Sequence, residues 1–84
     1  MEKTVRPGQP KTLMQAHEEL VRIRPSRDAA LVEWLRYYRL SVELYERIAV
    51  IDPGHNDDAR YWAQRERHHA EEITAQIREE RARR

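Results

Sequence analysis

The sequence predicts an all-α protein of three helices, a short first helix followed by a long antiparallel helical hairpin. Good helix formers, above all Glu, Arg, Ala and Leu, dominate the chain. The two glycines and four prolines fall at the start of the chain or between apolar segments of helical period. Within these segments, apolar side chains recur at spacings of three and four residues, as on one face of an amphipathic helix.

Size and composition exclude several classes of protein. The 84 residues allow one domain at most, and 39% of them are apolar, too many for a disordered chain. Sixteen basic and fifteen acidic side chains leave a net charge of +1, which gives no overall field to attract nucleic acid or a membrane. The absence of cysteine excludes disulfides, thiolate zinc sites and thiol nucleophiles. Without an apolar run fit for a secretion signal or a membrane helix, we expect a soluble cytoplasmic protein.

The first helix is expected at residues 12–24. Residues 1–11 combine proline and glycine with no apolar period, which predicts a flexible tail ahead of a single helical domain over residues 12–84. Thr12 is the expected N-cap, with Gln15 reaching back toward it in a capping box. The proline at position 25 ends the helix. The expected inner face consists of Leu13, Ala16, His17, Leu20 and Ile23.

The second helix, expected at residues 28–51, is apolar around most of its circumference. Ser26 or Asp28 is the expected N-cap. Two neighbouring helices cannot hide so broad an apolar surface, so a second copy of the chain is expected to cover the remainder. The sequence therefore predicts a homodimer. The apolar surface comprises Leu31, Trp34, Leu35, Tyr37, Tyr38, Ser41, Val42, Leu44, Tyr45, Ile48, Ala49 and Ile51.

A short turn separates the second helix from a third, expected at residues 57–80. Pro53 cannot continue the preceding helix, and Gly54 offers the left-handed conformation that often follows a helix end. Asn56 or Asp57 is the expected N-cap of the third helix. So short a turn places the two long helices antiparallel. The expected inner face consists of Ala59, Trp62, Ala63, Glu66, His69, Ala70, Ile73 and Ile77.

Counting outward from the turn pairs two polar inner residues of the third helix with tyrosines of the second. Glu66 is expected near Tyr45, and His69 near Tyr38. A buried polar group without a partner costs on the order of 1–3 kcal/mol. We therefore expect Glu66 and His69 to form hydrogen bonds with the two tyrosine hydroxyls.

The segment Ser41–Ala63 resembles the second helix of a tetratricopeptide repeat and the start of the next one. The small Ser41, the aromatic Tyr45 and the Asp52-Pro53 stop fall at suitable intervals. The resemblance implies a peptide-binding helical architecture. The sequence departs from the repeat pattern at Ile48, where alanine is usual, and the predicted second helix is much longer than a repeat helix.

Short runs along the chain resemble a family of short, all-helical actinobacterial proteins of unknown function. The resemblance implies a small freestanding protein, and it brings no activity, cofactor or catalytic residue with it. The runs are Arg22-Ile23-Arg24-Pro25, Glu33-Trp34-Leu35 with Tyr37-Tyr38, Gly54-His55 and Tyr61-Trp62-Ala63.

Glu66 and His69 form a Glu-x-x-His pair, a spacing that puts a carboxylate and an imidazole on one helical face. Di-iron bundles use two such pairs and a further glutamate from each of two other helices. His17 is an additional candidate ligand, and a dimer would double the set. The sequence nevertheless favours no metal and no other cofactor, because hydrogen bonds to tyrosines account for Glu66 and His69.

Arg22, Arg24 and Arg27 surround the first inter-helix turn and, with the basic tail, are candidates for binding phosphates. A helix-turn-helix protein needs an exposed recognition helix, whereas the helix after this turn buries most of its surface. The third helix alternates arginine with glutamate, which repels phosphate. The sequence therefore disfavours nucleic-acid binding, which remains the alternative function.

Residues that flank the main stripe of the second helix carry the predicted function. Tyrosine and tryptophan are favoured at contact hot spots, so we expect Tyr37, Leu40, Leu44 and Ile51 to bind an unknown protein partner or a second copy. A nucleophile–histidine spacing and a glycine-rich phosphate loop are both missing, which predicts that the protein is not an enzyme. The sequence predicts a small protein–protein interaction module, an adaptor or regulatory subunit. A nucleic-acid-associated regulator is the alternative, and a di-metal bundle protein is the third interpretation.

Overall fold

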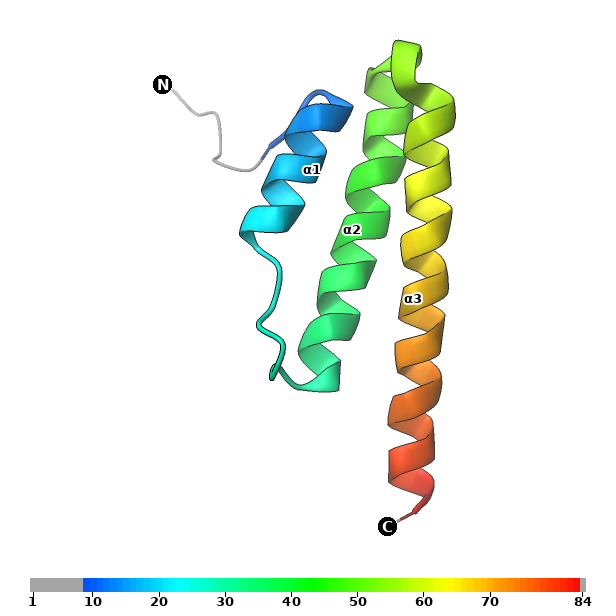
Figure 1. The fold of residues 1–84 in the computed structure, drawn as a ribbon. Helices are drawn as coiled ribbons and strands as arrows, with labels where there is room; N and C mark the ends of the chain where they lie inside the picture. Colours follow the sequence, from blue (N-terminus) through cyan, green and yellow to red (C-terminus); the bar gives the residue numbers. More distant parts are fainter. Residues whose placement is uncertain (1–8, 84) are drawn as a thin grey trace.

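Three α-helices and one short turn make up the fold (Figure 1). The computed structural model describes residues 9–83. α1 spans Leu13–Arg22, α2 spans Leu31–Ile51 and α3 spans Asn56–Ala82, and one turn of 3₁₀ helix at Pro53–His55 joins α2 to α3. The part of the chain that the structure describes contains no strand. The predicted all-α fold, a short helix followed by a long antiparallel hairpin, is confirmed.

The chain is anchored just ahead of α1. Residues 1–8 of the predicted tail lie outside the described residues, and Pro10 is already buried. Thr12 is the N-cap as predicted, because its Oγ1 accepts a hydrogen bond from the N–H of Gln15 at 3.1 Å. Gln15 reaches back one residue further than expected, since its Oε1 accepts the N–H of Lys11 at 2.9 Å.

α1 ends two residues earlier than predicted. The N–H of Ile23 bonds to the carbonyl of Glu19 at 3.1 Å, and the N–H of Arg24 bonds to the carbonyl of Val21 at 3.4 Å. These bonds close the last turn and satisfy carbonyl groups that the helix would otherwise leave unpaired. The chain therefore leaves the helix before it reaches the proline.

α2 begins three residues later than predicted, and neither predicted cap is used. Its N-cap residue is Ala30, which makes no side-chain hydrogen bond to the helix. The carbonyl of Ser26 instead accepts the N–H of Ala29 at 3.0 Å, and Asp28 is exposed in the linker. This turn lengthens the linker and leaves Glu33 as the acidic residue in the first turn of α2.

The turn between α2 and α3 does not use its glycine as predicted. Gly54 lies within the 3₁₀ turn with a φ outside the left-handed region, and a Cβ added there would meet no atom within 4 Å. Asn56 and Asp57 lie inside α3 and do not cap it. The side-chain amide of Asn56 donates to the carbonyl of Ala49 at 2.7 Å, which satisfies one of the last carbonyls of α2.

Asp52 connects this turn to α1. Its Oδ2 accepts the N–H of Leu13 at 3.2 Å and lies 3.1 Å from Nδ1 of His55. Leu13 is the first residue of α1, whose amide has no partner within the helix. The carboxylate therefore holds the N-terminus of α1 against the end of the hairpin.

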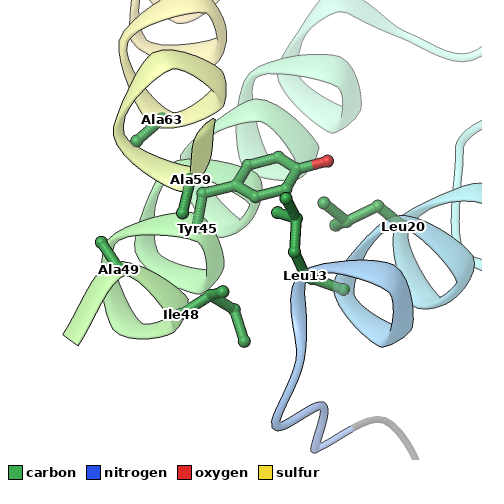
Figure 2. Close-up of a cluster of buried hydrophobic side chains, with 8 residues drawn as sticks. Leu13, Leu20, Tyr45, Ile48, Ala49, Ala59 and Ala63 are labelled. Atoms are coloured by element: carbon green, nitrogen blue, oxygen red, sulfur yellow. The ribbon is translucent and has the colours of Figure 1, made fainter. Parts of the chain in front are cut away.

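α1 packs beside α2 near the turn, and we call the face of the α2–α3 hairpin that it occupies the covered face (Figure 1). Tyr45 and Ile48 project from α2 toward the leucines of α1, while α3 contributes alanines (Figure 2). The small α3 residues let the two long helices approach closely. The buried cluster of the covered face consists of Leu13, Ala16, Leu20, Tyr45, Ile48, Ala49, Ala59 and Ala63.

Candidate functional site

The predicted partner surface of Tyr37, Leu40, Leu44 and Ile51 is divided in the structure. Tyr37 and Leu44 are half-buried against the cluster of the covered face, and the Tyr37 hydroxyl donates to the carbonyl of Leu20 at 2.8 Å. Leu40 and Ile51 remain 45% and 44% exposed. Two of the four side chains therefore pack partly against the core of their own chain, and the other two are exposed.

Of the two predicted tyrosine neighbours, the structure places His69 beside Tyr38, but it pairs Tyr45 with a different residue from the one expected. The rings of Tyr38 and His69 are stacked with centroids 5.0 Å apart, which confirms the predicted proximity, but stacking takes the place of the predicted hydrogen bond. The Tyr45 hydroxyl lies 2.7 Å from Nδ1 of His17, in a hydrogen bond whose donor depends on the imidazole tautomer. The predicted bond between Tyr45 and Glu66 is wrong, because α1 brings His17 to that hydroxyl.

Burial keeps the tyrosine hydroxyls of the covered face neutral. It raises the pKa of Tyr45 to about 12, and the negative charge of Glu66 adds to the rise. It also raises the pKa of Tyr37 and of Tyr38 above the usual value. A catalytic base or nucleophile needs a pKa closer to neutrality, so the raised pKa values of these hydroxyls give a catalytic role no support.

The candidate metal ligands Glu66, His69 and His17 do not converge. Nε2 of His69 lies 3.9 Å from Oε1 of Glu66, and its Nδ1 lies 3.3 Å from Oε1 of Glu72. His17 meets the ring of Trp62 edge-on, with centroids 5.0 Å apart. Within residues 9–83, no group of three His, Cys, Asp or Glu side chains is placed to hold a metal ion. The geometry gives the di-metal interpretation no support.

The arginines of the first linker do not form a common basic patch. Nε of Arg22 donates to Oε1 of Glu19 at 3.0 Å, and this pairing raises the pKa of Arg22. The guanidinium of Arg24 lies over the ring of Trp34, 5.4 Å from its centroid. Arg27 is exposed in the linker. Two of the three candidate phosphate ligands are therefore engaged within the chain.

The face of the hairpin away from α1 carries a row of adjoining hollows that form a groove, and we call it the open face. Three hollows follow one another between α2 and α3: one of about 590 Å³ near the start of α2, a middle hollow of about 530 Å³ and one of about 660 Å³ nearest the turn. Arg39 and Thr74 line two of these hollows and Arg67 links one of them to the third, so the hollows adjoin. Their lining residues come from α2, α3 and the N-cap of α2, and none comes from α1.

Small side chains line the floor of two of the hollows, Leu31, Leu35 and Ile77 line the hollow nearest the start of α2, and charged side chains form the rims. The floor includes Val42, Ala70 and Thr74 with the exposed Ala75, and it shares Ala49 and Ala63 with the buried cluster of the covered face. Because these floor side chains are small, a further helix could approach the hairpin closely there. The rims carry both signs of charge, on Arg39, Glu43, Glu46, Arg67, Glu71 and Arg78. Glu46 and Arg67 form an ion pair from one rim to the other.

The sequence prediction missed the open face. Val32 and Val50, which are 54% and 79% exposed, lie along its α2 rim. Arg39 and Glu43 lie between them, and the successive spacings of seven, four and seven residues place all four side chains on one stripe of α2. This stripe was a readable signal, but the broader aromatic stripe of the same helix obscured it.

No protein-family model matches this chain, and no curated protein or solved structure matches it either. Among the described residues, none of the helices combines the length and the apolar character that crossing a membrane requires. The function must therefore be inferred from the geometry of the two faces of the hairpin.

Proposed function

We propose that the chain is a small protein-interaction module that binds α-helical polypeptide along its open face. The observation that carries this proposal is the row of three adjoining hollows between α2 and α3, two of them floored by small residues, with charged side chains on the rims. A helix laid into a groove is a recurring mode of protein recognition. On the covered face, α1 already packs in this way against the same two helices.

The open face is large enough to support a stable complex. The 21 residues of α2 correspond to a length of about 31 Å. Two packed helices present a strip about 18–20 Å wide, given their separation and their diameters. The product is roughly 600 Å², which approaches the roughly 800 Å² that each partner contributes to a typical interface.

The rims of the open face favour a polypeptide over a nucleic acid. Arg39 and Arg67 are accompanied there by Glu43 and Glu71. A phosphate backbone would meet these carboxylates and be repelled. A polypeptide helix can place an opposite charge against each side chain, which gives specificity and register. The alternative of a nucleic-acid-associated regulator therefore receives less support.

Photo-cross-linking from single sites tests the proposal. Val32 and Val50 on the open face and Val21 on α1 are all exposed valines, so a benzoylphenylalanine at any one of them leaves the core intact. Irradiation of cells that contain the full chain is expected to give discrete adducts from positions 32 and 50, attached within helical segments, and none from position 21. Equal labelling at all three positions, or no adduct from positions 32 and 50, would contradict the proposal.

A variant that fills the groove adds a matched control. Ala75→Arg places a bulky side chain in the middle hollow, whereas Ala82→Arg adds the same side chain on the same helix outside the hollows. We expect Ala75→Arg to lower the yield of the Val50 adduct about fivefold or more, and Ala82→Arg to leave it unchanged. Circular dichroism checks that both variants keep their helices. Persistence of the adduct in a folded Ala75→Arg variant would exclude the groove as the binding site.

A further inference from the structure

We infer that the occupant of the open face is a second copy of this chain, docked about a two-fold axis that passes α2 at Ser41. This inference names the partner of the proposed function and rests on it. α2 would lie against α2 of the second copy and α3 against its α3, which gives a four-helix bundle with antiparallel neighbours. A two-fold interface needs a self-complementary surface, and the open face has this property.

The valines on the α2 rim are placed symmetrically about Ser41. Val32 and Val50 lie nine residues to either side of it, and they are 54% and 79% exposed. Antiparallel docking places Val32 of one copy against Val50 of the other, and it does so twice in the dimer. Two side chains that the chain leaves in water thereby gain an apolar partner, which favours association.

The charges nearest the axis are complementary in the same arrangement. Arg39 and Glu43 lie two residues to either side of Ser41, and both line the middle hollow of the open face. The two-fold operation sets Arg39 against Glu43 of the second copy and Glu43 against its Arg39. A parallel alignment of the two α2 helices would instead set like charges against each other, so the charges select the antiparallel register.

α3 carries the same charge pattern beside the middle hollow. Arg67 and Glu71 lie two residues to either side of His69 and line the middle hollow. Val42 and Ala70, each one residue beyond the centre of its helix, line that hollow too. An axis that passes close to both residues would set Arg67, which pairs with Glu46 in its own chain, near Glu71 of the second copy.

One like-charge pair opposes the arrangement, and it provides a separate test. Arg60 and Arg78 lie nine residues to either side of His69 on the open face, so they would meet across the axis. Both side chains are exposed, and water screens their repulsion. Arg78→Glu would replace two repulsive pairs by two attractive ones. We expect this variant to dimerise about three- to tenfold more tightly.

Charge reversal on separate chains is the decisive experiment. Arg39→Glu and Glu43→Arg each place like charges across the axis, and we expect each to raise the dimer dissociation constant about tenfold in analytical ultracentrifugation. An equimolar mixture of the two variants restores opposite charges between unlike chains. We expect its dissociation constant to return to within about threefold of the unmodified value. Each α2 keeps its own like-charge pair in the mixture, so only contacts between chains explain a recovery.

Glu18→Arg serves as the control for altered charge. It changes the net charge as much as Glu43→Arg does, from an exposed position on α1 outside the open face. We expect its dissociation constant to match that of the unmodified chain. Circular dichroism checks that all variants remain helical. The tighter dimerisation expected from Arg78→Glu cannot arise from misfolding.

The outcomes separate this inference from the proposed function. A chain that sediments as a monomer at every concentration would overturn the second copy as occupant. A dimer that the mixed variants fail to restore would overturn the antiparallel arrangement. In both cases, adducts to another polypeptide from Val32 and Val50 would leave the proposed function standing. The absence of those adducts as well would remove both proposals.

Discussion

The same two helices form both faces of the hairpin, yet only one face is covered by a third helix. On the covered face, the large side chains of Tyr45 and Ile48 reach out from α2 and meet α1. On the open face, alanines and Val42 lie below rims of charged side chains. The comparison shows that side-chain size along one helical hairpin separates its two faces. Large residues stabilise the fold through burial, and small residues leave the groove in which we propose that a helix binds.

The largest expected effect comes from truncating one side chain on each face. Ile48 is fully buried on the covered face, so Ile48→Ala is expected to lower the free energy of unfolding by about 2–5 kcal/mol. Val50 is exposed on the open face, and Val50→Ala is expected to change it by less than about 0.5 kcal/mol. Urea denaturation at a protein concentration too low for association measures both. Equal losses would show that the two faces contribute alike to stability.

The second largest effect is expected from alkaline pH, which should lower the free energy of unfolding through Tyr45 on the covered face. The pKa of Tyr45 rises from its usual 10.0 to about 12 in the folded chain, so the unfolded chain loses this proton first. The stability that the neutral hydroxyl contributes is complete below pH 10 and is lost as the pH approaches 12. We expect a fall of about 1–2 kcal/mol over this window in urea denaturation. Tyr45→Phe should show a smaller fall, and an identical fall would contradict this assignment.

Asp52 is expected to have a smaller effect, because it holds only one end of α1. Asp52→Ala leaves the N–H of Leu13 without its partner and is expected to cost about 1 kcal/mol. Asp28→Ala changes an exposed residue of the linker and is expected to cost less than about 0.5 kcal/mol. Thermal unfolding of the two variants compares them directly. If both shift the midpoint equally, the contact between the turn and α1 does not stabilise the covered face.

The smallest effect is expected at the turn that both faces share. Gly54→Ala meets no atom within 4 Å and needs no left-handed backbone. The substitution restricts the unfolded chain and is therefore expected to stabilise the fold by about 0.4–1 kcal/mol. Pro53 and His55 stay unchanged, so the turn keeps its geometry. A loss of stability in urea denaturation would show that the turn does require glycine.

The helices and the register of the hairpin could be predicted from the sequence because both depend on spacing alone. The three apolar periods give three helices, and the stop at Pro53 fixes where the hairpin turns. Counting from that turn correctly places His69 beside Tyr38. The Thr12 cap was also predictable, since it depends on residues that are close in the chain.

The N-terminus of α2 and the hydrogen-bond partner of Tyr45 could not be predicted from the sequence, because several residues could have filled each role and tertiary packing selects among them. Ser26 and Asp28 are good cap residues, but a backbone turn in the linker moves the start of α2 past both of them. The Tyr45 hydroxyl bonds to His17 because of the position that α1 takes across the hairpin. That position is a consequence of tertiary packing and leaves no spacing signal in the chain. Leu40 and Ile51 were correctly counted among the exposed apolar residues, whereas Tyr37 and Leu44 pack against the core.

The separation of contacting residues along the chain also sets an order for folding. α2 and α3 are joined by the four residues from Asp52 to His55, so their pairing can begin beside this turn and extend outward while closing only short loops. The bonds from α1 span more of the chain, 28 residues from His17 to Tyr45 and 39 from Leu13 to Asp52. We therefore expect the hairpin to form first, with the grooves on both of its sides still unfilled. α1 then docks on one side as an intramolecular ligand, and the other side remains open to the second copy of the chain that we propose binds there.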